Sequence, residues 1–235
     1  LARRQGQLDL YSIRVPDGAD DDDNNDKDSQ LSLGSPTTIV KEDSGILDGK
    51  WTSDGDATTF YYATAHATGD IQLYQLMIHD QLDSRHTSPL EMIQVGRTLP
   101  RDGICLAVAW NHPLSIPGSS TLPKKLVSCY SNGQVAIHNV HGVVSAESFN
   151  SNSQQEQQHS TTAATLDLVE SWSAHQMFQN PAEVWAACFQ THQDDIVLTG
   201  GDEGQLKLWD VRVGTTRPVQ ILSKTFEAGV TVLSP

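Results

Sequence analysis

The sequence predicts an all-β protein in which one unit of short antiparallel strands is repeated, as in a β-propeller. Two observations lead to this fold class. A seven-residue pattern recurs with glycine, apolar and ring-bearing residues in a constant order, and strand-like segments of similar character precede most of its copies. The four copies are GQLDLYS (6–12), GDIQLYQ (69–75), GQVAIHN (133–139) and GQLKLWD (204–210).

Each copy of the seven-residue pattern begins with glycine and carries apolar residues at its third and fifth places. Such alternation is typical of a half-buried strand that the chain enters from a tight turn. The sixth place holds a bulky ring and the seventh a polar residue: Tyr11 and Ser12, Tyr74 and Gln75, His138 and Asn139, Trp209 and Asp210. Four matches to one template indicate an internal repeat.

The segments that precede the last three copies also resemble one another. Each opens with a strand-like run, namely ILDGKW (46–51), ICLAVAW (104–110) or EVWAACF (183–189), and a second apolar run then leads into the glycine turn. Further on, VQILSKTF (219–226) can supply a fourth strand, and GVTVLSP (229–235) can open another unit. Four short antiparallel strands per unit describe a propeller blade.

The copies are spaced more widely than the roughly 40–45 residues of an ordinary blade. The surplus lies in three polar segments that we expect to be loop insertions: a disordered acidic one at 17–38, one at 79–101, and a Ser/Gln/Asn-rich one at 141–171. About three whole blades with flanking strands remain. Residues 1–235 are therefore predicted to form a partial propeller, and the non-Met start and the apolar end favour the same view.

The net charge of the chain argues against some classes of binding partner. Its 235 residues carry a formal net charge of −14, and nucleic-acid binding is not expected because such surfaces are usually basic. Much of the excess lies in GADDDDNNDKD (18–28), which we expect to be a solvated loop, with a docking site for a basic partner as the alternative. No apolar run approaches the 18 residues of a membrane span, so no membrane association is expected.

The sequence shows no pattern typical of a metal or cofactor site. Cys105, Cys129 and Cys188 lie in apolar runs without CxxC spacing, so we expect buried free thiols in a reducing compartment. The histidines lack ligand spacing, and the usual nucleophile-elbow, phosphate-loop and dinucleotide motifs are absent. We expect no metal, no cofactor and an intracellular, cytoplasmic location.

The segment LTGGDEGQLKLWDVR (198–212) resembles the WD-repeat family. In that family a blade is held together by a His before its first strand, a Ser or Thr in the second, an Asp in the turn and a Trp in the third. The resemblance implies structural roles for His175, Thr199, Glu203, Trp209 and Asp210, with Glu203 where the family has Asp. Earlier units keep the hydroxyl residue as Thr64 and Ser128, but Thr68 and Asn132 replace the turn acid.

A longer stretch resembles one WD-repeat family in particular, the diphthine methyl ester hydrolases of diphthamide biosynthesis, also named diphthine methyltransferases. The matching features are Ala-His before the blade, Glu-x-Trp at its first strand, and the turn GGDEG (200–204). Four further segments follow the family's order: LDLYSIRV (8–15), SGILDGKW (44–51), TGDIQLYQL (68–76) and EAGVTVLSP (227–235).

This resemblance implies an esterase step on translation elongation factor 2. The family is understood to remove the methyl ester from the methylated diphthine of that factor, which frees the carboxylate for amidation. Other protein partners are compatible with the same fold. The alternative is a non-catalytic WD-repeat scaffold for protein–protein interaction, because a propeller fold alone does not specify a function.

Ester hydrolysis needs an activated water or nucleophile, a base and donors for the developing oxyanion. The candidates are Glu183 as base or cation partner, Trp185 as an aromatic face for the quaternary ammonium, and Asp202 in the turn. His175 is a candidate base only if it is not bonded to Thr199. The alternative is structural, with Glu183 capping a loop and Trp185 packing between blades. The sequence specifies no nucleophile.

Overall fold

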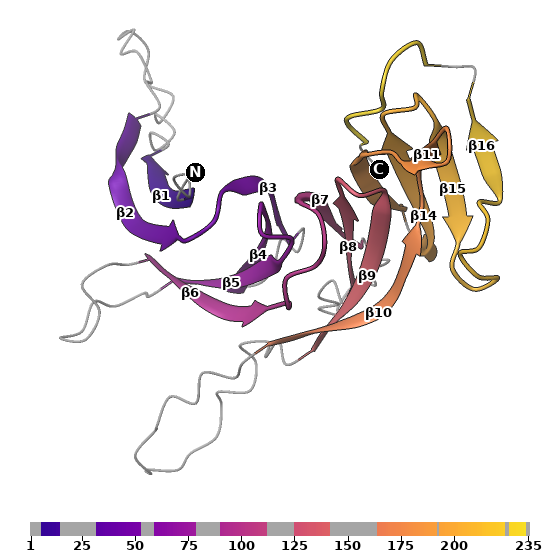
Figure 1. Ribbon diagram of the computed structural model, residues 1–235. Helices are drawn as coiled ribbons and strands as arrows, with labels where there is room; N and C mark the ends of the chain where they lie inside the picture. Colours follow the sequence, from indigo (N-terminus) through magenta and orange to yellow (C-terminus); the bar gives the residue numbers. More distant parts are fainter. Residues whose placement is uncertain are drawn as a thin grey trace, which may run out of the picture.

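The computed structural model describes residues 6–14, 32–52, 59–78, 90–111, 125–141, 164–191, 193–223 and 226–233. All regular elements in these ranges are β-strands, and three four-stranded antiparallel sheets stand side by side in chain order (Figure 1). The predicted all-β, partial-propeller class is confirmed. The described sheets form an open fan and do not close into a ring.

The three sheets are called blades 1, 2 and 3 below. Blade 1 consists of β3 (Ile46–Trp51), β4 (Thr59–His66), β5 (Ile71–Ile78) and β6 (Leu90–Arg97). Blade 2 consists of β7 (Cys105–Trp110), β8 (Lys125–Tyr130), β9 (Gln134–His141) and β10 (Thr165–Ser173). Blade 3 consists of β13 (Val184–Gln190), β14 (Gln193–Gly201), β15 (Leu206–Asp210) and β16 (Gln220–Leu222).

Two smaller sheets accompany the blades. Strands β1 (Gly6–Arg14) and β2 (Ser32–Glu42) pair beside blade 1, and β11 (Gln176–Met177) and β12 (Asn180–Pro181) form a short hairpin before blade 3. The seven-residue copies thus coincide with β1, β5, β9 and β15. No helix in the described part of the chain is long and apolar enough to span a membrane.

The expected insertions extended too far at their C-terminal ends. Strands β2, β6 and β10 occupy the last parts of 17–38, 79–101 and 141–171. Each is an outer strand of its sheet and follows a long polar segment, so the boundary between loop and strand could not be located from the sequence. Of the remainders, 17–31, 79–89 and 142–163 lie outside the described residues, and so does the acidic run 18–28, whereas 98–101 are described and follow β6.

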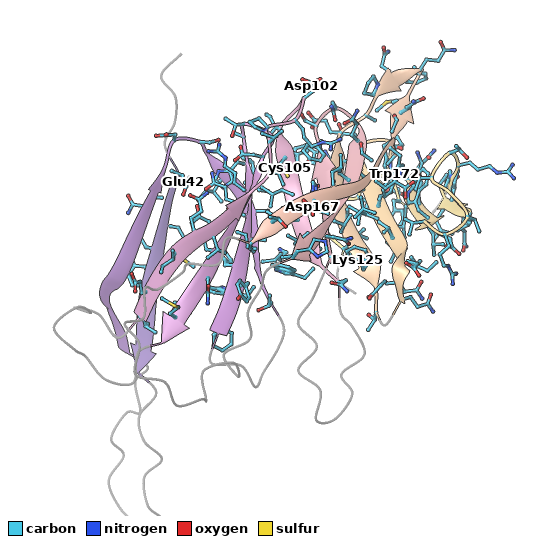
Figure 2. The ribbon with its side chains drawn as sticks, turned by 90° about the horizontal axis from the view of Figure 1, so that it is seen from below. Glu42, Asp102, Cys105, Lys125, Asp167 and Trp172 are labelled. Carbon is cyan, nitrogen blue, oxygen red and sulfur yellow. The ribbon has the colours of Figure 1, made fainter. Side chains whose placement is uncertain are left out.

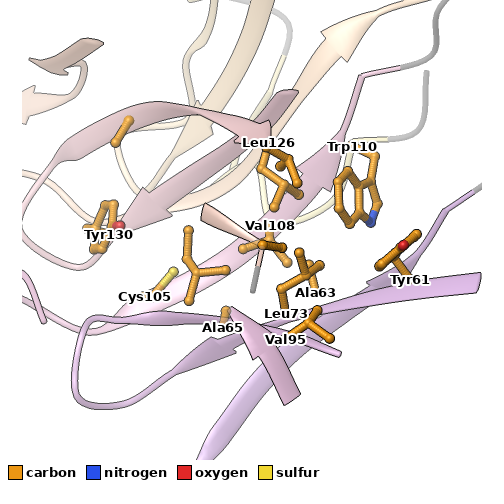
Figure 3. Close-up of a cluster of buried hydrophobic side chains, with 14 residues drawn as sticks. Tyr61, Ala63, Ala65, Leu73, Val95, Cys105, Val108, Trp110, Leu126 and Tyr130 are labelled. Atoms are coloured by element: carbon orange, nitrogen blue, oxygen red, sulfur yellow. The ribbon is translucent and has the colours of Figure 1, made fainter. Parts of the chain in front are cut away.

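The core lies between blades rather than within one. Strand β8 shows why, because both of its faces are covered and nearly every residue of KLVSCY is buried. Leu126 and Tyr130 face blade 1, in the cluster that includes Val108 and Trp110 (Figure 3). Val127 and Cys129 face blade 3. That second cluster also contains Val135, Ile137, Trp172, Ala174, Val184, Ala187, Phe189, Val197 and Trp209.

The glycine of the repeat is required by contact with the following blade. Gly133, in the turn before β9, has a φ of +80°, and a Cβ there would lie 2.6 Å from the carbonyl oxygen of His175. Gly69 and Gly204 also have positive φ and face the backbone of the next connection in the same way. Only glycine combines this φ with such close backbone approach at low energy. The turn glycines therefore allow each blade to pack closely against the connection that follows it.

The three cysteines, Cys105, Cys129 and Cys188, are buried and free. Burial raises the pKa of the Cys105 thiol to about 12 and that of Cys188 to about 11. Thiolates are the reactive form of cysteine, so these side chains act as small core residues.

Candidate functional site

The first strand of every blade contains a β-bulge at the same place. The pairing with the second strand shifts between Ile46 and Asp48 in blade 1, between Cys105 and Ala107 in blade 2, and between Val184 and Ala186 in blade 3. The extra residue is Leu47 in blade 1, Leu106 in blade 2 and Trp185 in blade 3. Bulges redirect side chains and are frequent beside functional sites.

All three bulge residues line one cavity of about 420 Å³. Its walls are the first strands β3, β7 and β13 and the C-terminal residues 231–233, which is where the central channel of a propeller lies. Trp51 and Trp110 line it near the ends of β3 and β7, whereas Trp185 lies at the start of β13. Aromatic rings therefore occur at both ends of the cavity. The complete lining is Leu47, Asp48, Lys50, Trp51, Leu106, Ala107, Val108, Ala109, Trp110, Trp185, Ala186, Ala187, Cys188, Thr231, Val232 and Leu233.

Blade 3 adds a carboxylate at its end of the cavity. The indole Nε1 of Trp185 donates a hydrogen bond to Asp202 Oδ1 at 2.6 Å. The backbone N–H of Asp202 donates to the carbonyl oxygen of Glu183 at 3.0 Å, so the turn between β14 and β15 lies beside the start of β13. Two residues before the turn glycine, where blade 3 has Asp202, blades 1 and 2 have Ala67 and Ser131. Among the three blades only blade 3 combines Trp with Asp at these positions.

The structure brings the three predicted site residues together, but in different settings. Trp185 is half-buried and lines the cavity, Asp202 is exposed, and Glu183 is half-buried. Neither carboxylate is among the cavity-lining residues. The site is thus an aromatic wall with the carboxylate of Asp202 bonded to it and Glu183 two residues before Trp185.

His175 lies apart from these three residues in a buried hydrogen-bonded chain. Its Nε2 is 2.7 Å from Thr199 Oγ1 and its Nδ1 is 2.6 Å from Glu203 Oε1. Trp209 Nε1 donates to the same Thr199 oxygen at 2.9 Å. Both ring nitrogens of His175 are therefore occupied, and its side chain is fully buried. Because His175 is bonded to Thr199, it is not available to act as a base.

The glutamate that replaces the family's turn aspartate makes the expected bond because Gly201 leaves room for it. A Cβ at Gly201 would lie 2.6 Å from both Glu203 Oε2 and His175 Nδ1. Although burial favours a higher pKa, the hydrogen bond from His175 and the neighbouring cation keep the pKa of Glu203 below its ordinary value. Burial lowers the pKa of His175.

Lys207 completes this chain and was not predicted from the sequence. It is only 8% exposed, and its Nζ donates to the carbonyl oxygen of Ala174 at 2.9 Å and to Glu203 Oε1 at 3.0 Å. Its spacing of four residues from Glu203 was a possible signal. A strand pattern alone could not show it, because Lys207 lies at an apparently solvent-facing place between two leucines.

Blades 1 and 2 use other partners around the same hydroxyl position. Thr64 Oγ1 lies 2.8 Å from His66 Nε2, and Ser128 Oγ lies 3.3 Å from His138 Nε2. Burial, with a smaller contribution from Arg101, lowers the pKa of His138 to about 4. At the turn, Thr68 donates to Asp70 and Asn132 donates to the carbonyl oxygen of Asp102.

Asp210 has a local role at the end of β15. Its Oδ1 accepts hydrogen bonds from the backbone N–H of Arg212 at 3.0 Å and from Arg212 Nε at 2.9 Å. These bonds close the turn that follows the strand. In the described part of the chain no group of three or more His, Cys, Asp or Glu side chains is placed to hold a metal ion.

Comparisons with known proteins agree with the resemblance found in the sequence. No family model matches the chain. The human protein named diphthine methyltransferase is 30% identical over 212 residues, covering 89% of this chain and 37% of its own length. The mouse protein of the same name is 27% identical over 74% of this chain and 30% of its own length. The chain resembles the diphthine methyltransferases.

A Dictyostelium discoideum diphthine methyltransferase homolog is 22% identical over 73% of this chain and 35% of its own length. The chain therefore spans about a third of the length of the curated relatives it matches. Among solved structures, a chain in the crystal structure of the mitotic checkpoint complex is 14% identical with a TM-score of 0.48, over 89% of this chain and 47% of its own.

Proposed function

We propose that this protein acts in diphthamide biosynthesis and hydrolyses the methyl ester of diphthine on translation elongation factor 2, in the cytoplasm. The similarity to proteins named diphthine methyltransferase supports the pathway. The observation that carries the site is the bond between Trp185 and Asp202 at the end of the cavity. Blade 3 differs from blades 1 and 2 at these two positions.

Trp185 and Asp202 suit a substrate with a quaternary ammonium group. The hydrogen bond uses the edge of the indole and fixes its orientation, while the ring lines the cavity. A cation binds to the face of a Trp ring more strongly than it binds to the face of Tyr or Phe. The carboxylate beside the ring adds negative charge at the place where the ammonium would lie. We assign substrate binding to this pair.

Glu183 is the proposed general base. It would take a proton from a water molecule whose oxygen forms a bond to the ester carbonyl carbon. The bond from that carbon to the methoxy oxygen then breaks, and the leaving group receives the proton from Glu183 and departs as methanol. The products are methanol and the carboxylic acid of diphthine, which releases the remaining proton of the water to solvent and becomes the free carboxylate. His175 has no part in this scheme because both of its ring nitrogens are bonded.

The test is methanol release by the full-length protein from elongation factor 2 that carries methylated diphthine. We expect release by the wild type, a large loss of kcat for Glu183→Gln, and a rise in KM for Asp202→Asn. Removing a general base typically lowers the rate by about 10²–10⁴-fold. Absence of methanol, when a control esterase releases it from a small methyl ester in the same buffer, would contradict the proposal.

A non-catalytic scaffold is the second candidate, and one observation favours it. Asp202 is exposed, and neither Asp202 nor the half-buried Glu183 lines the cavity. A scaffold predicts that a stable protein complex is recovered with the wild type and that no substrate is turned over. Methanol release that depends on Glu183 would exclude a purely structural role.

A further inference from the structure

The connection that leads into blade 3 differs from the other two described connections between blades. Residues 43–45 join β2 to β3 and residues 98–104 join β6 to β7, both without regular structure. The connection 174–183 instead contains the hairpin of β11 and β12. In Figure 2 this hairpin projects from the end of the sheets where Asp102 is labelled, opposite Lys125. The hairpin is thus an addition at the end of blade 3 that carries Trp185 and Asp202.

The tip of this hairpin is strained and apolar. Its two central residues, Phe178 and Gln179, have φ values of 49° and 69°. A two-residue turn with both φ positive strongly prefers Asn-Gly, and bulky residues rarely adopt this conformation. Phe178 is nevertheless 90% exposed, and Met177 beside it is 39% exposed. Strained backbone persists where the surrounding structure holds it, and it is most common at functional sites.

The stem of the hairpin is held firmly. Ala182 donates its backbone N–H to the carbonyl oxygen of His175 at 3.1 Å, which closes the base of the hairpin. His175 is bonded through its side chain to Thr199 and Glu203, and Gly133 packs against its carbonyl oxygen. An aromatic side chain on a rigid support loses little entropy on binding, which is what an interface anchor requires.

Exposed acidic side chains also occur in other loops at this end of the sheets. Asp102 lies between β6 and β7, Asp202 in the turn before β15 and Glu227 after β16, and all three are exposed. Their loops share the end of the sheets where each turn glycine meets the following connection. At the same end, Arg97 pairs with Asp70 at 2.7 Å, whereas Arg101 donates to the uncharged Ser171 at 2.6 Å and keeps its charge. The exposed carboxylates disfavour nucleic acid and anionic membranes and favour a basic protein surface.

We infer that Phe178 is an anchor that docks the folded protein substrate, by entering an apolar depression flanked by basic residues near the modified side chain. This inference rests on the proposed function, because it assigns the partner from the neighbouring ester site. Glu183 follows the hairpin directly in the sequence, so a substrate held by Phe178 is presented beside the cavity. Aromatic residues are enriched among the few side chains that dominate interface affinity.

The experiment measures the Kd of the full-length protein for elongation factor 2 carrying methylated diphthine. We expect Phe178→Ala to raise the Kd by about 30-fold, the effect of a hot-spot residue. The matched control is Val213→Ala, since Val213 is 73% exposed but lies in the turn after β15 at the other end of blade 3. The control should leave the Kd unchanged.

A second variant separates docking from folding. Phe178→Asn combined with Gln179→Gly provides the preferred turn residues, so the protein should become more stable, with Tm higher by about 2–4 °C. The same variant should bind the substrate protein as weakly as Phe178→Ala. Wild-type Kd in either variant, or no binding of the substrate protein by the wild type, would overturn the inference.

Methanol release, measured in parallel, distinguishes the two proposals. Phe178→Ala should raise KM for the protein substrate while kcat/KM for a short peptide carrying the same ester stays at the wild-type value. A wild type that binds the protein substrate through Phe178 but releases no methanol would refute the hydrolase and leave the docking role standing.

Discussion

Blades 1 and 3 have the same strand order and the same bulge, yet their polar interiors differ. In blade 3, His175, Thr199, Glu203 and Trp209 form one buried chain that Lys207 extends. In blade 1 the equivalent of Trp209 is Tyr74, whose hydroxyl oxygen lies 2.8 Å from Gln72 Oε1 and within hydrogen-bonding distance of Glu42. The backbone geometry of the repeat thus tolerates different hydrogen-bonded groups.

The difference at the cavity is of another kind. Leu47 and Leu106 in blades 1 and 2 are ordinary apolar residues, whereas Trp185 is bonded to a carboxylate. The interior of each blade needs only to satisfy its own buried polar atoms. The charged residues of blade 1 that line the cavity, Asp48 and Lys50, pair with each other at 3.0 Å. In blade 3 the carboxylate of Asp202 is instead exposed and bonded to an aromatic ring of the cavity wall.

The largest expected effect concerns the interior of blade 3. Trp209 is 2% exposed, packs against Trp172 and donates to Thr199. Trp209→Ala should lower the free energy of unfolding by about 3–5 kcal/mol. Trp51→Ala is the control, because Trp51 is 43% exposed, and it should cost only about 1 kcal/mol. Denaturant unfolding measures both, and similar losses would contradict this account of the blade.

An intermediate effect is expected where blades 2 and 3 meet. Gly133→Ala places a Cβ against the carbonyl oxygen of His175 and should cost about 2–4 kcal/mol. Gly214→Ala is the matched control, since Gly214 has a φ of +97° but nothing within 4 Å of the added Cβ. It should cost about 1 kcal/mol for the backbone alone. Thermal unfolding compares the two, and equal Tm values would show that the contact between blades is unimportant.

A smaller, pH-dependent effect is expected in blade 2. Because burial lowers the pKa of His138 to about 4, the folded state binds its proton less readily than the unfolded state, where the pKa is 6.5. The folded state therefore has its full stability above pH 6.5. As the pH falls toward 4, the free energy of unfolding decreases by about 3 kcal/mol. His138→Phe should flatten the decline in unfolding free energy over this range. An unchanged slope would refute the assignment.

Much of the fold was predictable because its signals are local. The glycine turns and the alternation that follows them define β5, β9 and β15 within a few residues of sequence. The fourth strands β6 and β10 were not predictable in this way. Their pairing depends on neighbours on the far side of a long connection, which no local sequence pattern reveals.

The residues of the candidate site could be predicted from the sequence, but their arrangement in space could not. Trp185 and Asp202 stand out as departures from the repeat, but they are 17 residues apart and only folding shows the bond between them. The replacement of the turn acid by Glu203 could not be judged from sequence, because its bond to His175 depends on the space above Gly201. The shared cavity lining of Trp51, Trp110 and Trp185 likewise needs the fold.

The placement of the substrate site at Trp185 is tested most directly by replacing this residue with the one that blades 1 and 2 have at the bulge. Trp185→Leu copies Leu47 and Leu106 and should preserve Tm, while kcat/KM for methanol release from methylated diphthine falls by about 30-fold, the value of a desolvated cation–π contact. Trp185→Tyr should retain most of the activity because it keeps an aromatic face. Wild-type kcat/KM in a correctly folded Trp185→Leu protein would contradict the placement of the site at this end of blade 3.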